Sequence, residues 1–393
     1  MINHENRHLK IAFLAAEPPL DKRALSTSLY YMGKALEKHC GDVYYFDKIV
    51  SFEKRYLGNL IEGVSKYLFR KNVARARLPF VAKKHGKIVA EKLKGRSFDA
   101  IVAIMNPQDV AYLETDIPIV LVLDATFALQ HNYYSHFTNL WKWSAKQASK
   151  VEEIAYQNSA ALLYSSSWAA QSALEDYHVD PEKVHTIYFG ANFDTIPSRE
   201  MVLAKKKSER CRLLFMGIGW ERKGGAIAFE TLVKLEEMGI EAELIVCGST
   251  PPREYVHERM LVIPFLDKND ERQSKEIENL YAMSDFLLLP TRADCAPNVF
   301  REANAFGVPA ITADTGGAAD LVRNGENGFV LPYNASGSEY ARIIAEIYQD
   351  DQRYTALVQS SRDAYESRLN WDTWAIGVKD ILVKLIVPEK VPV

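Results

Sequence analysis

Two carboxylates eight positions apart interrupt an apolar part of the chain, the stretch LLLPTRADCAPNVFREANAFGVPAIT at residues 287–312. The run PNVFREANAF has the apolar spacing of a helix, which places Asp294 in the loop before it and Glu302 two turns along it. Taken singly, Asp294 could be a charge at a helix N-terminus, and Glu302 could lie on a solvated face or pair with Arg301. Because apolar runs flank the helix and a buried unpaired carboxylate is costly, we expect Glu302 to have hydroxyl or cationic partners.

The start of the same helix offers backbone donors. Pro297 suits the first helical position, so the free N–H groups of residues 298–300 would point toward a ligand. Gly307 ends the helix, and VPAIT begins the next strand. A helix start of this kind favours an anion.

A glycine-containing turn, FMGIGWERKGG at residues 215–225, could bind phosphate. Its glycines permit a tight turn and then open a helix whose free N–H groups favour an anion; they are Gly217, Gly219, Gly224 and Gly225. Arg222 and Lys223 add two cations. Glycines are common in such turns for steric reasons, and exposed Arg–Lys pairs are usually solvated. The combination nevertheless predicts a phosphate clamp.

Short apolar runs separated by helical stretches supply the elements that must position these residues. The runs are KIAFLAA, DVYYFD, FDAIVAI, PIVLVLDA, AALLYSS, HTIYFG, RLLFMGIG, AELIVCG, LVIPFL, DFLLLPT, PAITAD and GFVLPY. Strands alternating with helices predict an α/β fold with two parallel sheets, each covered on both faces. Ligands of such sheets bind at the carboxyl ends of the strands, which is where the residues above lie.

A chain of 393 residues suits two domains. The polar stretch DTIPSREMVLAKKKSER reads as a linker between the two sets of strands, and the helical spacing of WDTWAIGVKDILVKLIV predicts a closing helix. The predicted parts are an N-terminal Rossmann-like domain at 1–195, a linker at 196–210, a C-terminal Rossmann-like domain at 211–370, and the closing helix with a tail at 371–393.

The composition indicates a soluble enzyme-sized protein, with 48% hydrophobic and 25% charged residues. The four cysteines form no CxxC pair, so neither a zinc cluster nor a disulfide framework is indicated, and a reducing cytoplasm fits best. The apolar stretch IAFLAA near the start is too short for a signal peptide or a membrane span. A net charge of −3 argues against a dedicated nucleic-acid binder.

The second half of the chain resembles the retaining glycosyltransferases of family 4, in which two Rossmann-like domains face each other in the GT-B architecture. The family's hallmark is a Glu, seven residues, and a second Glu. DCAPNVFREA keeps this spacing, with Asp294 in place of the first Glu and Glu302 as the second. The following NAFGVPAITADTGGAADLVRNGENGFVLP is similar to the family's run after the motif, and the resemblance is strong over residues 213–332.

The resemblance implies that Glu302 binds the ribose hydroxyls of a nucleotide sugar and that Asp294 faces hydroxyls of the donor sugar. The implied nucleotide-sugar site comprises Gly217, Arg222, Lys223, Ala296, Pro297, Asn298, Val299 and Glu302. Fixed cations and helix N–H groups would stabilise the negative charge that develops on the leaving diphosphate. The donor is therefore expected to be a substrate, with no other cofactor and no metal.

The chain departs from the family pattern in three places. Ile218 stands where the family usually has an Arg, so Arg222 must supply the second cation. Asp294 is one methylene shorter than Glu. After the first strand, Ser26, Thr27 and Ser28 replace glycines; these hydroxyls could bind phosphate or acceptor, or could simply begin the next helix as N-caps.

The acceptor side is expected at PIVLVLDATFALQHNYYSHF, residues 118–137, where Thr126, Tyr133 and Tyr134 accompany two candidates. Asp124 is the first choice for orienting the acceptor or stabilising positive charge on the sugar, and His131 is the second. A helix N-cap is the alternative for Asp124. The candidate catalytic residues are Asp124, His131, Arg222, Lys223 and Asp294. The serine-rich turn at 165–167 is expected to cap a helix.

A basic segment lies between residues 51 and 96. It contains thirteen Lys or Arg and three Glu, which gives a net charge of about +10. Cations and aromatic residues alternate along it, so residues 54–96 could lie on an anionic membrane surface from the cytoplasmic side. An anionic soluble acceptor and a solvated helix face are the alternatives.

The motifs and the resemblance together predict a metal-independent glycosyltransferase of the hexosyltransferase type, and a retaining reaction is what the resemblance implies. The enzyme would move a sugar from a UDP- or GDP-sugar to a hydroxyl acceptor, such as a glycan, a small molecule, or a lipid-linked or polysaccharide precursor of the cell envelope. A nucleotide-sugar epimerase and a non-catalytic nucleotide-sugar-binding protein are the alternatives. A hydride-transferring enzyme is less favoured, because no G-x-G-x-x-G follows the first strand.

Overall fold

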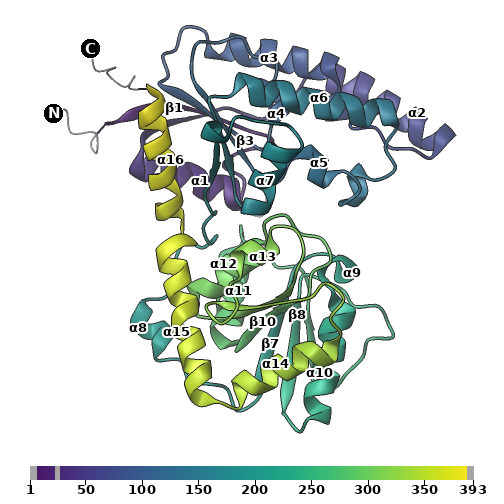
Figure 1. The fold of residues 1–393 in the computed structure, drawn as a ribbon, viewed down its shortest axis with the longest axis vertical. Coiled ribbons are helices and arrows are strands. Elements are labelled where there is room, and N and C mark those ends of the chain that lie inside the picture. The colour runs from purple at the N-terminus through teal and green to yellow at the C-terminus, as the bar shows by residue number, and fades with distance from the viewer. Residues whose placement is uncertain (1–6, 23–26, 387–393) are drawn as a thin grey trace. The chain divides into compact units, whose positions relative to one another are not determined.

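The chain folds into two units in a computed structural model that describes residues 7–22 and 27–386 (Figure 1). Unit 1 is Met1–Ile187 together with Trp374–Val393, and unit 2 is Tyr188–Thr373. Each unit contains one six-stranded sheet in which every pairing is parallel. The predicted α/β class with two Rossmann-like sheets is confirmed.

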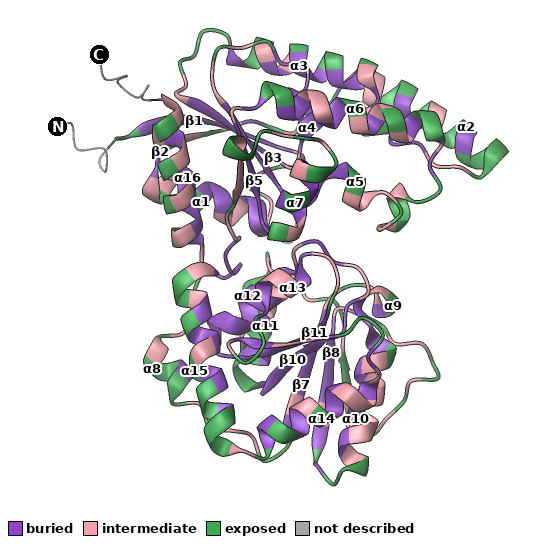
Figure 2. Ribbon diagram, in the orientation of Figure 1, coloured by how far each residue is buried: buried purple, intermediate pink, exposed green. Residues whose placement is uncertain are grey.

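The sheet of unit 1 has the order β2-β1-β3-β4-β5-β6. Its strands are β1 (Leu9–Ala15), β2 (Gly41–Tyr45), β3 (Ala100–Ile104), β4 (Ile119–Leu123), β5 (Ala161–Tyr164) and β6 (Val184–Thr186). All residues of β3, β4 and β5 are buried, and Figure 2 shows β3 and β5 as purple ribbon. Continuous apolar runs of this kind predicted strands that are covered on both faces.

Unit 1 surrounds this sheet with helices from many parts of the chain. They are α1 (Ser28–His39), η3 (Glu53–Gly58), α2 (Asn59–Phe69), η4 (Arg75–Arg77), α3 (Pro79–Leu93), α4 (Pro107–Val110), α5 (Phe127–Gln130), η5 (Ser135–Phe137), α6 (Lys142–Asn158), α7 (Ser167–Glu175), η6 (Pro181–Lys183) and α16 (Trp371–Ile386). Alternate strand residues such as Ile101 and Ala103 share one core with Val89 of α3 and Val151 of α6. Because alternate residues of a strand point to one face, α3 and α6 cover the same face of the sheet.

The last helix, α16, packs within unit 1 from residue 374 onward. Trp374 is fully buried, and the Cys40 thiol at the end of α1 donates to the carbonyl oxygen of Ala375 at 3.7 Å. Ile187, the last residue of unit 1 before unit 2 begins, lies beside Gly377 of α16. The predicted closing helix is therefore present, and its burial ties it to the first sheet.

The sheet of unit 2 has the order β12-β11-β10-β7-β8-β9. Its strands are β7 (Cys211–Met216), β8 (Ala242–Cys247), β9 (Met260–Ile263), β10 (Phe286–Leu289), β11 (Ala310–Ala313) and β12 (Gly328–Leu331). The strand that comes first in sequence, β7, lies between β8 and β10, so the direction of winding reverses between β7 and β10. The loops after these two strands adjoin at the point where open α/β sheets bind ligands.

Unit 2 contains helices from four residues to eighteen residues long. They are α8 (Arg199–Leu203), α9 (Trp220–Lys223), α10 (Gly225–Glu237), α11 (Glu271–Met283), α12 (Asn298–Ala305), α13 (Ala318–Leu321), α14 (Gly337–Tyr348) and α15 (Asp351–Arg368). The segment predicted as a linker contains α8, in which Val202 is buried beside Gly307. The other predicted domain limits stay predictions.

At the predicted site, the structure differs from two local predictions and agrees with a third. Pro297 is the N-cap of α12 rather than its first helical residue, and it has an extended backbone. Arg222 and Lys223 lie in the short helix α9 rather than in an open turn. Gly307 has a φ of +63° just after α12, so it ends the helix as predicted.

The described part of the chain, residues 7–22 and 27–386, has no helix with the length and apolar character needed to span a bilayer.

Close packing of β11 against β12 gives a test of the fold. A Cβ at Gly328 would lie 1.9 Å from the carbonyl oxygen of Ala310, whereas a Cβ at Gly325 would meet nothing within 4 Å. Both residues have positive φ, of +151° and +76°. We expect Gly328→Ala to lower the free energy of unfolding by about 3 kcal/mol through overpacking, and Gly325→Ala by about 1 kcal/mol through backbone strain alone. Urea unfolding curves measure both, and equal losses would contradict the packing described.

Candidate functional site

The glycine turn after β7 has the backbone conformation that its sequence predicted. Gly217 has a φ of +152°, its N–H donates to the carbonyl oxygen of Cys247 at 2.9 Å, and its own carbonyl oxygen accepts from the Ser249 hydroxyl at 2.5 Å. Gly219, with a φ of +93°, is the N-cap of α9. Because side chains rarely adopt these angles, the two glycines direct the chain from the end of β7 into α9.

Steric crowding explains why residues 224 and 225 are glycines. A Cβ at Gly224 would lie 2.0 Å from the carbonyl oxygen of Pro290, and a Cβ at Gly225 would lie 2.1 Å from the Trp220 ring. Gly224 also has a φ of +79° where α9 turns into α10. These two glycines therefore allow α10 to start directly against the loop after β10, and their predicted role near an anion stays a prediction.

Three of the predicted site residues come together where the loops after β7 and β10 meet. The Lys223 ammonium forms an ion pair with Oδ2 of Asp294, and Arg222 Nη1 lies 3.7 Å from the same oxygen. Only 7% of Lys223 and 8% of Asp294 are exposed. Two cations and one carboxylate give this group a net positive charge, as a site for a diphosphate requires.

Hydrogen bonds hold the two loops together around this group. Arg222 donates from Nη1 to the carbonyl oxygen of Ala293 at 2.9 Å and from Nη2 to that of Ile218 at 3.1 Å. In return, the Arg222 carbonyl oxygen accepts from the Arg292 N–H at 2.7 Å and from the Thr291 hydroxyl at 3.2 Å. Arg222 thus bridges both loops, which fixes the position of its guanidinium.

The start of α12 is supported by a buried guanidinium that the sequence did not single out as a site residue. Arg301 is fully buried, and its Nη2 donates to the Ala296 carbonyl oxygen at 3.1 Å and to Oδ1 of Asn298. It also lies 5.6 Å from the centre of the Phe189 ring. Ala296 and Asn298, both predicted to contact the nucleotide, therefore have their conformation fixed by Arg301.

Glu302 has the hydroxyl and cationic partners that its burial predicted. Only 3% of the residue is exposed, and its two carboxylate oxygens accept from the Lys268 ammonium at 2.6 Å and from the Tyr281 hydroxyl at 2.9 Å. Lys268 also donates to the Asn192 carbonyl oxygen at 3.1 Å and lies over the Phe193 ring. The alternative prediction, that Glu302 pairs with Arg301, is wrong. Each carboxylate oxygen keeps a second lone pair for a ligand hydroxyl.

Burial raises the pKa of the Tyr281 phenol well above its ordinary value, and the charge of Glu302 raises it further. Tyr281 therefore stays protonated and keeps donating to Glu302. Lys268 and Tyr281 are functional candidates that sequence reasoning missed, since they lie in the loop after β9 and in α11, outside the recognised motif. The only signal was the general rule that a buried carboxylate needs partners.

In unit 1, the loop after β4 is organised by Thr126 and by Glu152. The Thr126 hydroxyl caps α5 by accepting from the Leu129 N–H at 3.3 Å, so the alternative of an N-cap role for Asp124 is wrong. The buried Glu152 accepts from the Phe127 N–H at 2.5 Å and from Arg77 at 3.0 Å. Asp124 is the residue that directly follows β4, where a ligand of this sheet would bind.

Aromatic contacts arrange the residues that follow α5. His131 stacks on Phe127 with ring centres 5.8 Å apart, and Tyr133 packs on Trp168 at 5.6 Å. The Ser166 hydroxyl caps α7 by accepting from the Ala169 N–H, which confirms the capping prediction. Thr27 occupies the N-cap position of α1 with a φ of +71°, and its side chain makes no capping hydrogen bond. Ser26 lies outside the described residues.

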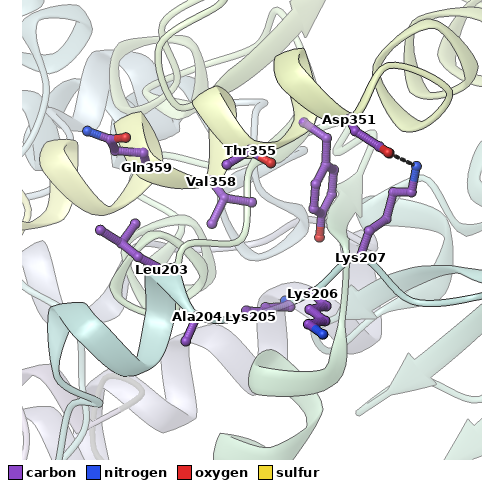
Figure 3. A pocket seen from close by; sticks show the side chains of 10 residues that line it. Leu203, Ala204, Lys205, Lys206, Lys207, Asp351, Thr355, Val358 and Gln359 are labelled. Carbon is purple, nitrogen blue, oxygen red and sulfur yellow. Dashed lines mark hydrogen bonds and ion pairs between the residues drawn. The ribbon is translucent and has the colours of Figure 1, made fainter.

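A cavity of about 520 Å³ in unit 2 shares no lining residue with the predicted site (Figure 3). It is lined by Leu203, Ala204, Lys205, Lys206, Lys207, Asp351, Tyr354, Thr355, Val358 and Gln359. The Lys207 ammonium pairs with Asp351, and that of Lys205 donates to the Ser284 carbonyl oxygen. Two of its three lysines are therefore already bound within the protein, which makes the cavity a poor match for an anion.

The same cavity gives a prediction on pH. Burial lowers the pKa of Lys205 to about 8 from its ordinary value of 10.5, although the charge of Asp285 opposes this. Between these two pH values the unfolded chain binds more protons at Lys205, so stability rises with pH there. We expect Lys205→Met to reduce this pH-dependent rise in the free energy of unfolding, by at most about 3 kcal/mol. Lys206 is exposed, so Lys206→Met should leave the rise unchanged. Unfolding curves over this pH range measure the difference, and parallel curves for wild type and Lys205→Met would refute it.

Among the described residues, no group of three or more His, Cys, Asp and Glu side chains could hold a metal ion.

The sequence is similar to a family model and to several known proteins. Residues 202–364 match the family model described as Glycosyl transferases group 1. The chain is 23% identical over 324 residues to spore coat protein SA of Bacillus subtilis (strain 168), covering 77% of this chain and 82% of that protein. It is 26% identical over 254 residues to D-inositol 3-phosphate glycosyltransferase of Xylanimonas cellulosilytica, covering 58% of each.

A solved structure with a similar fold is that of Anabaena Alr3699/HepE in complex with UDP and glucose. The TM-score is 0.60 at 18% identity, over 96% of this chain and 100% of that chain. At this identity the likeness shows the fold alone, which is the two-domain Rossmann-like GT-B architecture.

Proposed function

Since the chain is a glycosyltransferase of the GT-B fold with a group 1 domain in residues 202–364, we propose that it transfers a sugar from a UDP- or GDP-sugar to a hydroxyl acceptor. We further propose that the reaction retains the configuration of the sugar and uses no metal ion. The observation that carries the proposal is the cationic group of Arg222 and Lys223 around Asp294 at the reversal point of the second sheet.

The chemistry needs this group because breaking the glycosidic bond leaves negative charge on the diphosphate. Lys223 and Arg222 supply fixed positive charge, and the N–H groups at the start of α12 supply further donors. Asp294 holds Lys223 in place before the donor binds, and in the D-x7-E motif it also accepts from hydroxyls of the donor sugar. Little reorganisation is then needed as charge develops.

Nucleotide recognition is proposed for Glu302, through the ribose hydroxyls. Lys268 and Tyr281 hold its carboxylate in one orientation, with lone pairs left for ligand hydroxyls. UDP is bound in the similar Anabaena structure, which supports a nucleoside diphosphate in this chain.

The acceptor side of the proposal rests on unit 1. Asp124 and His131, which follow β4 and α5, are proposed to orient the acceptor hydroxyl or to stabilise positive charge on the sugar. The acceptor is a glycan, a small molecule, or a lipid-linked or polysaccharide precursor. The basic segment 54–96 is proposed to meet an anionic membrane surface on its cytoplasmic side.

Nucleotide binding tests the role of Glu302. A thermal-shift panel of UDP, GDP, ADP, TDP and their sugar conjugates should give a base-selective rise in the Tm of the wild type. Glu302→Ala should weaken binding of the selected nucleotide by about 2 kcal/mol, since hydrogen bonds to a charged group are lost, and Glu302→Gln should weaken it less. The exposed Glu346→Ala is the control and should bind normally. A normal shift with Glu302→Ala would exclude this role for the residue.

Transfer kinetics test the role of Lys223. Lys223→Met should lower kcat by about 10²-fold with a smaller effect on KM, because its charge is needed most as the bond breaks. Lys234→Met, which removes a partly exposed lysine paired with Glu237, is the matched control and should keep the wild-type kcat. The Tm of each variant without ligand separates this effect from misfolding. Equal kcat values for Lys223→Met and the control would remove Lys223 from the mechanism.

The same assay decides the finer parts of the proposal. Proton NMR of the anomeric product signal distinguishes retention from inversion, and activity that persists in EDTA supports a metal-independent reaction. Interconversion of nucleotide sugars without an acceptor would identify an epimerase. Nucleotide binding without transfer or donor hydrolysis would identify a binding protein.

A further inference from the structure

Residues 50–69, which include η3 and α2, expose many large apolar side chains. Tyr67 is 87% exposed, and Phe52, Leu60 and Leu68 are each more than 60% exposed. The other exposed apolar residues in this segment are Val50, Tyr56, Leu57, Val64 and Phe69. Figure 2 shows α2 largely in the colour of exposed residues. A contiguous apolar surface of this kind marks a binding site.

The exposed residues of α2 follow the spacing of a buried helix face. Leu60, Val64, Tyr67 and Leu68 occupy positions i, i+4, i+7 and i+8, which form one stripe. In a globular protein that stripe normally faces the core. Here the only buried residue of α2 is Ser65, so the stripe faces away from the body of unit 1.

Polar bonds attach the opposite side of α2 to the unit. The Ser65 hydroxyl donates to the Lys71 carbonyl oxygen and accepts from Nε1 of Trp141, both at 2.7 Å. Phe69 contacts the Trp141 ring at 5.4 Å, and Glu62 pairs with Arg75 at 2.5 Å. The helix is therefore fixed in an orientation that presents its apolar stripe to the solvent.

Charge around the stripe selects the partner. Residues 50–71 contain five cations and two acids, a net charge of about +3; they are Lys54, Arg55, Lys66, Arg70, Lys71, Glu53 and Glu62. The nearby helix α3 adds the exposed Lys83, Lys84 and Lys87. A second copy of the chain would bring the same positive charge against this surface, which is repulsive. An anionic lipid surface matches both the charge and the apolar stripe.

We propose that η3 and α2 lie in the surface of an anionic bilayer, with Leu60, Tyr67 and Leu68 among the acyl chains and the flanking cations at the headgroups. The proposal deepens the membrane part of the proposed function, because it assigns insertion to η3 and α2 and leaves long-range attraction to the α3 lysines. Tyr and Phe side chains suit this depth, since their rings are apolar and tolerate an interfacial position.

Vesicle binding tests the proposal with the full chain. Wild type is sedimented with phosphatidylcholine vesicles that contain phosphatidylglycerol, and the partition constant is compared with that of L60Q/Y67Q/L68Q. Loss of three buried apolar side chains should reduce the partition constant by about tenfold or more. The matched control V256Q/L261Q removes two side chains of unit 2 that are 77% and 57% exposed, and it should bind as the wild type does.

Salt and lipid composition separate insertion from attraction. Neutralising Lys83, Lys84 and Lys87 should reduce binding at low salt and have little effect at high salt, whereas L60Q/Y67Q/L68Q should reduce binding at both. Equal wild-type binding to vesicles of phosphatidylcholine alone would overturn the anionic part of the proposal. Equal binding by wild type and L60Q/Y67Q/L68Q would overturn insertion.

Light scattering and the Tm shift with nucleotide distinguish membrane insertion from dimer formation and from misfolding. Light scattering that shows a wild-type dimer, a monomeric L60Q/Y67Q/L68Q and no vesicle binding would assign the stripe to a second copy and overturn the proposal. The Tm shift with nucleotide should be the same in L60Q/Y67Q/L68Q and wild type, which also shows that the variant is folded. If wild type binds vesicles as expected but no nucleotide shifts its Tm, the proposed sugar transfer fails while the docking surface stands.

Discussion

The ion pair between Lys223 and Asp294 is the interaction on which the second half of the molecule depends. Both residues are less than 10% exposed, and a buried charge that loses its partner is strongly destabilising. The pair therefore joins the loop after β7 to the loop after β10. The glycines around it follow from this constraint, since Gly224 must allow α10 to approach the Pro290 carbonyl oxygen for the two loops to meet.

A second set of buried charges extends the same principle along α12. Glu302 satisfies both of its oxygens with Lys268 and Tyr281, and Arg301 satisfies Ala296 and Asn298. The site is thus organised by buried charged groups that have polar partners within the protein. Unused lone pairs on Glu302 and the net positive charge of Arg222, Lys223 and Asp294 are the features that would suit a ligand with negative charge and hydroxyl groups.

The sequence predicted those features that a single short segment determines. Each of the twelve apolar runs overlaps a strand in the part of the chain that the structure describes. Strands buried on both faces, such as β3, β4 and β5, must be apolar throughout, whereas the edge strands β2, β6 and β9 are partly exposed. Parallel topology then brought Lys223 and Asp294 together. Lys268 and Tyr281 could not be foreseen, because they reach Glu302 from distant segments. The helices α8 and α9, of five and four residues, are too short to show a period. The stripe of α2 predicts a helix, but periodicity alone does not say which face meets the solvent.

The division of unit 1 between the two ends of the chain bears on how the protein is made. Unit 2 is continuous in sequence, whereas the core of unit 1 includes Trp374, Val378 and Leu382 of α16, all fully buried. During synthesis the ribosome releases the sheet of unit 1 first, yet that unit lacks part of its core until α16 emerges. The half of the protein translated first is therefore the last to be completed, and the nascent chain passes through a stage in which only unit 2 has its whole core.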